Sequence, residues 1–443
     1  MIKRLTSLVA LLCAYTFASA VNYLTFTAEA DSSSFGIVNE DNSVDVQYSL
    51  DDGGTWNTLP EGEMIPLEQG AKALLRGNNP DGFSSDEDNY THFTMTGSIA
   101  ASGSVMSLID GVGETKEIPC PHCFFELFSG CASLTQAPEL PATKLSMACY
   151  KSIFIDCSNL TKAPELPAME MEMMCYDGMF WRCTSLKEAP ELPATEMANG
   201  CYGGLFDGCS SLTKAPKLPA TVLKDFCYVQ MFIGCTSLEE APDLPATELA
   251  INCYCEMFAG CTSLKKAPEL PAMNLKKECY RGMFKRCTSL EKSPKLPATE
   301  LDLAHDCYKE LFAKCSNLSQ ITVSFTQWGG SQSWVDSVAP TGTFICPATL
   351  REIYGKDKIP EGWNMKPNEE TGTESISSTD CTIWTENLSL FVCGAEGRIE
   401  VYDLNGKLLR SAQGKENETV RFVLPGKGMY VVKTETKSVK IFN

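Results

Sequence analysis

The chain has 443 residues, 22 of them cysteine, and a formal net charge of −19 at pH 7. Surfaces that bind nucleic acid must be basic, so this charge excludes nucleic acid as an expected ligand and argues against anionic membrane surfaces. The length allows two or three domains.

The first 20 residues have the features of a signal peptide. A cationic start, "MIKR", precedes the apolar run "LTSLVALLCAYTF", and Ala18-Ser19-Ala20 forms a small-residue cleavage site. We predict a leader over residues 1–20 and a mature chain that leaves the cytoplasm. No later apolar run is long enough for a transmembrane segment. In an exported protein such a cysteine density favours disulfides over metal sites, and no cofactor is predicted.

Residues 21–110 predict an N-terminal β-sandwich, because segments such as "NYLTFTAEA" and "THFTMTGSI" alternate apolar and polar residues. Within them "SLDDGGTW" matches the Asp-box hairpin of sialidases. In that motif the aspartate binds backbone N–H groups of a turn and the tryptophan packs beneath it. One copy in a segment of this length excludes a propeller. We therefore interpret Asp51, Gly53 and Trp56 as residues that hold a turn.

Cys120-Pro121-His122-Cys123 is the dithiol sequence typical of DsbA-type oxidoreductases. Such a site needs a scaffold that lowers the pKa of one thiol, and the flanking sequence shows no βαβ pattern. Cys123 is also the first cysteine of the repeat described next, which leaves only Cys120 as an addition. We interpret the motif as the edge of that repeat.

A pattern of 26 residues recurs from Cys123 onward, as in "CYDGMFWRCTSLKEAPELPATEMANG". There are seven full units and a final fragment, which begin at Cys123, Cys149, Cys175, Cys201, Cys227, Cys253, Cys279 and Cys307. One unit cannot bury its apolar face alone, so the units are expected to stack into a solenoid.

Two kinds of local structure are expected in each unit. Leu145, Cys149, Ile153 and Cys157 recur at helical spacing, which predicts a short helix over "ATKLSMACYKSIF". The "APEL" segment is expected to be extended for only two or three residues, because the flanking prolines have no N–H to give to a ladder. The predicted fold class is therefore mostly β with short helices.

Each unit contains two cysteines with seven residues between them. The pairs are Cys123 and Cys131, Cys149 and Cys157, Cys175 and Cys183, Cys201 and Cys209, Cys227 and Cys235, Cys253 and Cys261, Cys279 and Cys287, and Cys307 and Cys315. Zinc ligands are normally two to four residues apart, so zinc is the weakest interpretation. A disulfide within a unit requires the chain to fold back, since residues eight apart in one helix are ~12 Å apart. The sequence leans toward that bridge, and the alternative is two columns of buried thiols. Both roles are structural.

The residue between proline and leucine of each extended segment is expected to face solvent. These residues form a candidate binding stripe, namely Glu139, Glu165, Glu191, Lys217, Asp243, Glu269 and Lys295. Adjacent glutamates at coil spacing repel one another, so a basic partner or cations could neutralise the stripe. A merely soluble face is the alternative.

The segments "MFIGCTSL" and "MFAGCTSL" resemble the "AFxGCxxL" core of BspA-type leucine-rich repeats of Bacteroidetes surface proteins. The resemblance covers about residues 119–365, with "GTFICPATLREIYGKDKIPEGW" as a terminal cap. It implies a leucine-rich-repeat solenoid over residues 111–365. It also implies adhesion to host or bacterial surface proteins or glycans.

A polar linker over residues 366–380 leads to a C-terminal domain over residues 381–443. Asn405-Gly406 in "GRIEVYDLNGKLLRSA" suits a type I′ hairpin turn. The run "IEVYDLNGKLL…LPGKGMYVVK…VKIFN" resembles the C-terminal sorting domain of the type IX secretion system. This resemblance implies a small β-sandwich that engages the export machinery and leads to the outer cell surface. Cys381 and Cys393 are close enough in sequence to staple it. The alternative is a small immunoglobulin-like binding domain.

Catalytic patterns are scarce. The three histidines are far apart, no nucleophile lies in a recognisable frame, and no phosphate-binding glycine loop occurs. We predict a secreted, surface-displayed adhesion scaffold that is not an enzyme. The alternatives are a structural surface-layer component, an exported thiol oxidoreductase and a glycan hydrolase.

Overall fold

The computed structural model describes residues 21–301, 306–368, 376–377, 382–386, 389–404, 406–415, 418–426, 428–435 and 438–442. Regular structure among these residues is almost all β, with one short helix, α1 (Ser107–Asp110). The chain divides into two compact units, residues 1–366 and 367–443. The predicted signal peptide, Cys381 and most of the predicted linker lie outside the described residues.

Two sheets open the first unit. One has the order β4-β3-β6-β1-β8-β9 and the other β5-β2-β7. The strands are β1 (Leu24–Ala28), β2 (Ser33–Glu40), β3 (Gln47–Ser49), β4 (Asn57–Thr58), β5 (Ile65–Leu67), β6 (Lys72–Arg76), β7 (Tyr90–Thr96), β8 (Ile99–Ser102) and β9 (Leu134–Gln136). The pairs are antiparallel except β8 with β9, which is parallel.

Aromatic side chains join these two sheets. In β1 every second residue is buried, as the alternating sequence requires. The ring of Phe26 packs edge-on against Phe35 of β2 and Phe93 of β7, with centroids 5.3 and 5.1 Å apart. These rings belong to the same buried cluster as the repeat that follows.

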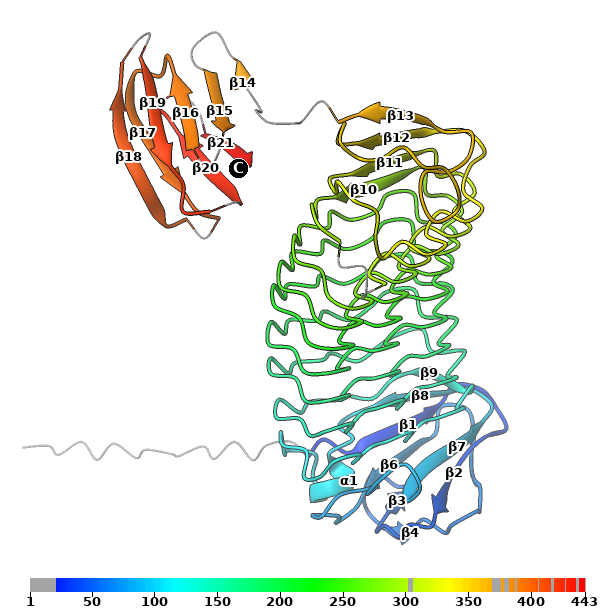
Figure 1. Ribbon diagram of the computed structural model, residues 1–443. Coiled ribbons are helices and arrows are strands. Elements are labelled where there is room, and N and C mark those ends of the chain that lie inside the picture. Colours follow the sequence, from blue (N-terminus) through cyan, green and yellow to red (C-terminus); the bar gives the residue numbers. More distant parts are fainter. Residues whose placement is uncertain are drawn as a thin grey trace, which may run out of the picture. The chain divides into compact units, whose positions relative to one another are not determined.

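The repeat forms a β-solenoid of stacked coils that runs between the N-terminal sheets and strands β10 to β13 (Figure 1). Side chains 26 residues apart lie over one another. Tyr202 and Tyr228 stack with centroids 6.0 Å apart, and Phe206 and Phe232 stack at 5.6 Å. The buried tyrosine column comprises Tyr150, Tyr176, Tyr202, Tyr228, Tyr254, Tyr280 and Tyr308. Each coil therefore buries the apolar face of its neighbour.

The helices predicted in the repeats are not present among the described residues. The segments are successive turns whose alternate residues donate N–H groups to the next coil. Tyr202 donates to the Cys227 carbonyl, Gly204 to Val229 and Phe206 to Met231, at 2.8 to 3.1 Å. The intervening residues bond three positions back in their own turn, as Asp207 does to the Gly204 carbonyl at 3.0 Å. Coil-to-coil bonds replace the i to i−4 bonds that a helix would use.

Left-handed backbone makes these turns possible. Three positions per unit have positive φ, and they are four residues apart. They are His122, Ala148, Met174, Gly200, Phe226, Asn252, Glu278 and Asp306 at the first position; Glu126, Ser152, Gly178, Gly204, Gln230, Glu256, Gly282 and Glu310 at the second; and Gly130, Asp156, Arg182, Gly208, Gly234, Gly260, Arg286 and Lys314 at the third. Such φ values end a helix. The apolar spacing of four residues thus reflects repeated turns.

Pairing between the extended segments is sparse, as expected beside prolines. In the described part of the repeat, the extended segments form two strands, β9 and β10 (Lys292–Leu296). Elsewhere single bridges connect coils, such as Glu188 with Lys214 and Glu240 with Lys266.

Both ends of the solenoid are covered by segments that imitate a coil. At the N-terminal end Phe93 of β7 donates its N–H to the Leu127 carbonyl and stacks on Phe128 at 5.4 Å, which extends the phenylalanine column by one ring. At the other end the Phe312 N–H bonds to the Trp334 carbonyl. Strands β11 (Gln320–Val323), β12 (Thr343–Cys346) and β13 (Asn364–Pro367) then continue the β10 sheet.

The second unit contains two four-stranded sheets, with orders β14-β15-β16-β19 and β18-β17-β20-β21. The strands are β14 (Ile376–Ser377), β15 (Thr382–Glu386), β16 (Ser389–Cys393), β17 (Gly397–Tyr402), β18 (Leu408–Gly414), β19 (Thr419–Val423), β20 (Met429–Lys433) and β21 (Ser438–Phe442). Both sheets contribute to one buried cluster that includes Leu390, Val392, Val401 and Val432. Alternating β-branched residues therefore give this unit a core of its own.

Candidate functional site

The Asp-box residues form a compact turn between β3 and β4. The Asp51 carboxylate accepts hydrogen bonds from the Thr55 N–H, the Thr55 hydroxyl and the Ser49 hydroxyl, at 2.7 to 2.8 Å. These bonds, led by that from the Thr55 N–H, lower the pKa of Asp51 to about 2. Gly53 has a φ of 89°, and the Arg76 guanidinium lies 4.0 Å from the centroid of the Trp56 ring. The Asp51 carboxylate holds the turn, Gly53 supplies its left-handed backbone, and the Trp56 ring packs against Arg76.

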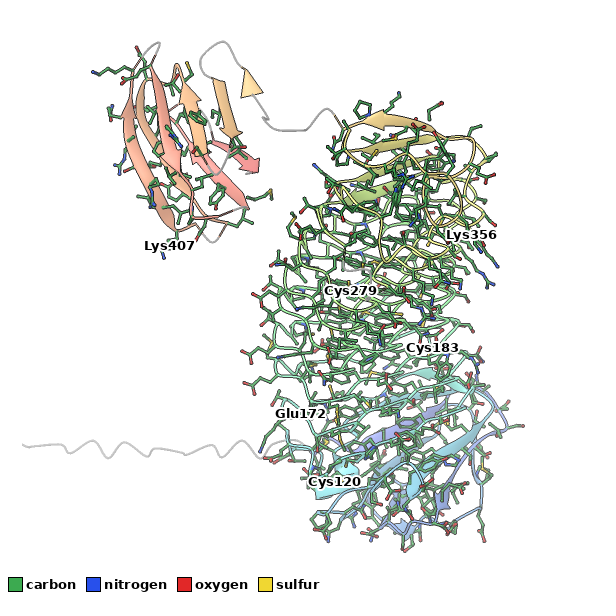
Figure 2. All side chains as sticks on the ribbon, in the orientation of Figure 1. Cys120, Glu172, Cys183, Cys279, Lys356 and Lys407 are labelled. Atoms are coloured by element: carbon green, nitrogen blue, oxygen red, sulfur yellow. The ribbon has the colours of Figure 1, made fainter. Side chains whose placement is uncertain are left out.

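The sixteen repeat cysteines form two buried columns. The in-unit disulfides toward which the sequence leaned are not formed, and this corrects that prediction. Figure 2 labels Cys183 and Cys279 within the coil stack. Burial raises the pKa of Cys149 and Cys261 to about 12, so these thiols stay protonated and unreactive at neutral pH.

The second cysteine of each unit donates a hydrogen bond from its thiol to a backbone carbonyl. The thiol of Cys209 donates to the Phe180 carbonyl in the preceding coil at 3.1 Å, and Cys235 donates likewise to Phe206. The same bond recurs at Cys131, Cys157, Cys183, Cys261, Cys287 and Cys315. The thiol thus bonds to a neighbouring coil rather than to the other cysteine of its own unit.

All seven residues of the candidate stripe are exposed. Glu139 is bound by Asn22, whose amide donates to its carboxylate at 2.7 Å. Lys295 lies in β10, opposite Thr322 of β11. Among the described interactions, Glu165, Glu191, Lys217, Asp243 and Glu269 have no hydrogen-bonded or ionic partner.

A ladder of alternating charge runs beside the stripe. Successive coils place Lys162, Glu188, Lys214, Glu240 and Lys266 at one exposed position. Residues at this position are bridged in register, as Glu188 is to Lys214. Each of these five charges has at least one opposite charge one coil away, although Lys292 follows Lys266 at the same position. The alternation largely neutralises this face and weakens the case for the stripe as an acidic binding surface.

A second exposed surface lies where each coil re-enters the turn segment. It carries large apolar side chains that solvent reaches, which we call the apolar patch: Met169, Met173, Met174, Val222, Phe226 and Ile251. Their exposed fractions are 39 to 53 %. The sequence alone did not indicate this patch, because the residues at these positions vary from unit to unit. Aligning the units shows methionine, phenylalanine or isoleucine where other units have asparagine, glycine or lysine.

Backbone hydrogen bonds hold the positions of the apolar patch in register over four coils, with Asn199, Gly200 and Asp225 between the apolar side chains. Met174 donates its N–H to the Asn199 carbonyl, Gly200 to Asp225 and Phe226 to Ile251, at 2.9 to 3.0 Å. Three coil spacings of ~4.8 Å give a patch roughly 14 Å long. A Cβ at Gly200 would lie 3.2 Å from Cγ of Met174, so the methionine side chain covers the glycine.

Acidic side chains surround the apolar patch. Glu170 and Glu196 are bridged in register and both are exposed, so like charges lie one coil apart. Glu172, which Figure 2 shows at the outer edge of the coil stack, is also exposed, as is Glu248. Exposed lysines also lie near the patch: Lys224 within it, Lys144 one coil before Glu170 and Lys277 one coil after Ile251. We call Glu170, Glu172, Glu196 and Glu248 the acidic rim.

Other features of the described residues give no binding site. An open depression of about 410 Å³ lies beside α1, but the Asp110 carboxylate there already accepts the backbone N–H groups of residues 112–115. Within the described ranges no three His, Cys, Asp or Glu side chains are grouped to hold a metal ion. No helix among them is long and apolar enough to cross a membrane.

Comparison with known proteins gives one distant likeness. No family model matches the chain, and no curated protein matches it. A solved structure of a leucine-rich cell surface protein from Faecalibacterium prausnitzii A2-165 is 14 % identical and covers 74 % of this chain and 94 % of its own. The TM-score of 0.28 is too low for that likeness to support a conclusion about fold or function.

Proposed function

We propose that the chain is an exported repeat protein of the cell surface that recognises a protein partner and catalyses no reaction. The observation that carries the proposal is the apolar patch with its acidic rim. Folded proteins seldom leave clustered large apolar side chains in solvent, and clusters with a polar rim are typical of interaction sites. The neutralised charge ladder and the structural thiols offer no comparable surface.

The chemistry of the patch defines the partner as a cationic amphipathic protein segment. Apolar side chains of such a segment would cover Met173, Met174 and Phe226, and methionine adapts readily to partners of different shape. Its lysines or arginines would face the acidic rim and relieve the repulsion between Glu170 and Glu196. Nucleic acid and anionic lipid are disfavoured by the same charges.

Display on the cell surface is the second part of the proposal. It is supported by the leader-like residues 1–20 and by the resemblance of residues 381–443 to type IX sorting domains. We expect removal of residues 381–443 to leave the chain inside the cell or periplasm, whereas the complete chain reaches the outer surface. Surface proteolysis of intact cells measures the difference, and equal protease sensitivity would contradict this part.

Binding is tested with fluorescence anisotropy of a labelled peptide of alternating lysine and leucine. We expect it to bind the complete chain and to dissociate as salt rises, because the acidic rim is exposed to screening. A combined Glu170→Gln, Glu172→Gln and Glu196→Gln variant should bind about tenfold more weakly, which corresponds to ~1.4 kcal/mol. Phe226→Ser should weaken binding without changing its salt dependence.

Matched controls separate the patch from general acidity. Glu269→Gln removes an exposed carboxylate from the stripe and should leave binding unchanged. A peptide of alternating glutamate and leucine should not bind. The assignment of the patch would be overturned if both peptides bound equally well. It would also be overturned if Glu269→Gln weakened binding as much as the combined variant does.

A further inference from the structure

Two cysteines lie three positions apart immediately before the first coil. Cys120 is partly exposed, and its thiol lies 3.3 Å from the Ser84 carbonyl, to which it can donate. Cys123 is fully buried at the start of the first cysteine column. The Ser84 backbone joins the two residues, because its N–H donates to the Cys123 carbonyl at 3.0 Å while its carbonyl faces the Cys120 thiol. Figure 2 labels Cys120 at the N-terminal end of the coil stack.

The surrounding backbone holds Cys120 in this place. Its sulfur lies 2.1 Å from the position that a Cβ on residue 82 would occupy, so only glycine leaves room for it. His122 has a φ of 55°, which turns the chain between the two cysteines. Cys131 donates its thiol to the Phe93 carbonyl at 3.1 Å and is therefore occupied elsewhere.

The two thiols differ in reactivity. Interaction with the Cys123 thiol lowers the pKa of Cys120 below its ordinary value. Burial, followed by the contact with Cys120, raises the pKa of Cys123 well above its ordinary value. A thiolate is the nucleophile in exchange reactions, so the exposed Cys120 is the attacking group and the buried Cys123 is the resolving group.

We propose that Cys120 and Cys123 are a redox-active pair that forms a disulfide by exchange with a small external disulfide. The Cys120 thiolate attacks one sulfur of the external disulfide, which breaks its S–S bond and releases one thiolate. The Cys123 thiol then loses its proton and attacks the Cys120 sulfur, which expels the second thiolate. Two protein thiols are oxidised and one external disulfide is reduced to two thiols. The pair goes beyond the proposed recognition function and does not depend on it.

Oxidised glutathione is the probe, applied to the folded complete chain. After quenching, alkylation under denaturing conditions and tryptic digestion, the peptide of residues 117–144 contains Cys120, Cys123 and Cys131. We expect it to carry an alkyl group on Cys131 alone and a bridge between Cys120 and Cys123. A bridge between Cys123 and Cys131, or three alkylated cysteines, would overturn the proposal.

Variants distinguish the two roles. Cys123→Ala should leave glutathione attached to Cys120, because the resolving thiol is gone, whereas Cys120→Ser should leave Cys123 without an adduct. Thermal melts verify that each variant is folded, and Cys123→Ser replaces Cys123→Ala if the latter is not. Cys393, also partly exposed, is the internal comparison and should react at least about tenfold more slowly than Cys120. Equal rates at both positions would contradict the proposal.

Discussion

The antiparallel strands of residues 24–102 and the coils from residue 123 share one buried cluster, yet they use their backbones differently. The strands pair along their length and alternate buried with exposed side chains. The coils pair through turns in which every fourth residue has left-handed backbone. Two glycines illustrate the difference: Gly77 in the strand region is required for space, whereas Gly234 in the coil region is required for conformation.

The largest effect should come from the aromatic columns that hold the coils together. Phe206 is fully buried and stacked between Phe180 and Phe232. Phe206→Ala should lower the free energy of unfolding by about 3–5 kcal/mol. Phe226→Ala, at an exposed position of the same unit, should change it by less than ~0.5 kcal/mol. Chemical denaturation measures both, and equal effects would mean that the column is not the main support.

Glycine substitutions test the contrast directly. A Cβ on Gly77 would lie 2.2 Å from the Asp45 carbonyl oxygen, so Gly77→Ala should cost about 2–3 kcal/mol through steric conflict. A Cβ on Gly234 would meet nothing closer than 3.7 Å, but its φ is 70°. Gly234→Ala should therefore cost ~1 kcal/mol through backbone strain alone. Thermal unfolding of the two variants should show this order, and the reverse order would refute the contrast.

A half-buried carboxyl group gives the coils a pH dependence. Burial raises the pKa of Asp177 from 3.8 to about 6. The unfolded chain releases this proton more readily, so stability falls as pH rises from about 4 to about 6 and is constant above. Asp177→Asn should remove that fall and stabilise the protein at pH 7 by on the order of 1–2 kcal/mol.

Denaturant titrations at several pH values test the Asp177 prediction. The curves of the variant and the original chain should converge below pH ~4, where both side chains are neutral. Asp243→Asn, at an exposed stripe position, controls for the loss of one charge. A constant difference between the Asp177→Asn variant and the original chain at all pH values would contradict the burial of this carboxyl group.

The stacking of the coils could be predicted from the sequence, but the turns within each coil could not. The recurrence of tyrosine, phenylalanine, leucine and cysteine every 26 residues indicates which side chains share a column. The spacing of Cys149, Ile153 and Cys157 suits a helix and a four-residue turn equally well. A glycine at every left-handed position would have indicated turns rather than a helix. Instead Met174 and Phe226 adopt positive φ in the same column as Gly200.

The candidate site was predicted only in part, for related reasons. Exposure of the stripe follows from its place between a proline and a buried leucine. The partner of Cys209 could not be deduced, because it is the carbonyl of Phe180, a backbone group in another coil. The apolar patch depends on which variable positions turn outward, and that is set by the left-handed residues.

Far-UV circular dichroism of the purified chain tests the central claim most directly, namely that the repeat consists of coil-paired turns. The account predicts a spectrum without the double minimum of α-helix, since α1 is the single helix among the described residues. Helices over the segment equivalent to residues 142–154 in every full unit would make about a fifth of the chain helical. A spectrum with that helix content would contradict the account.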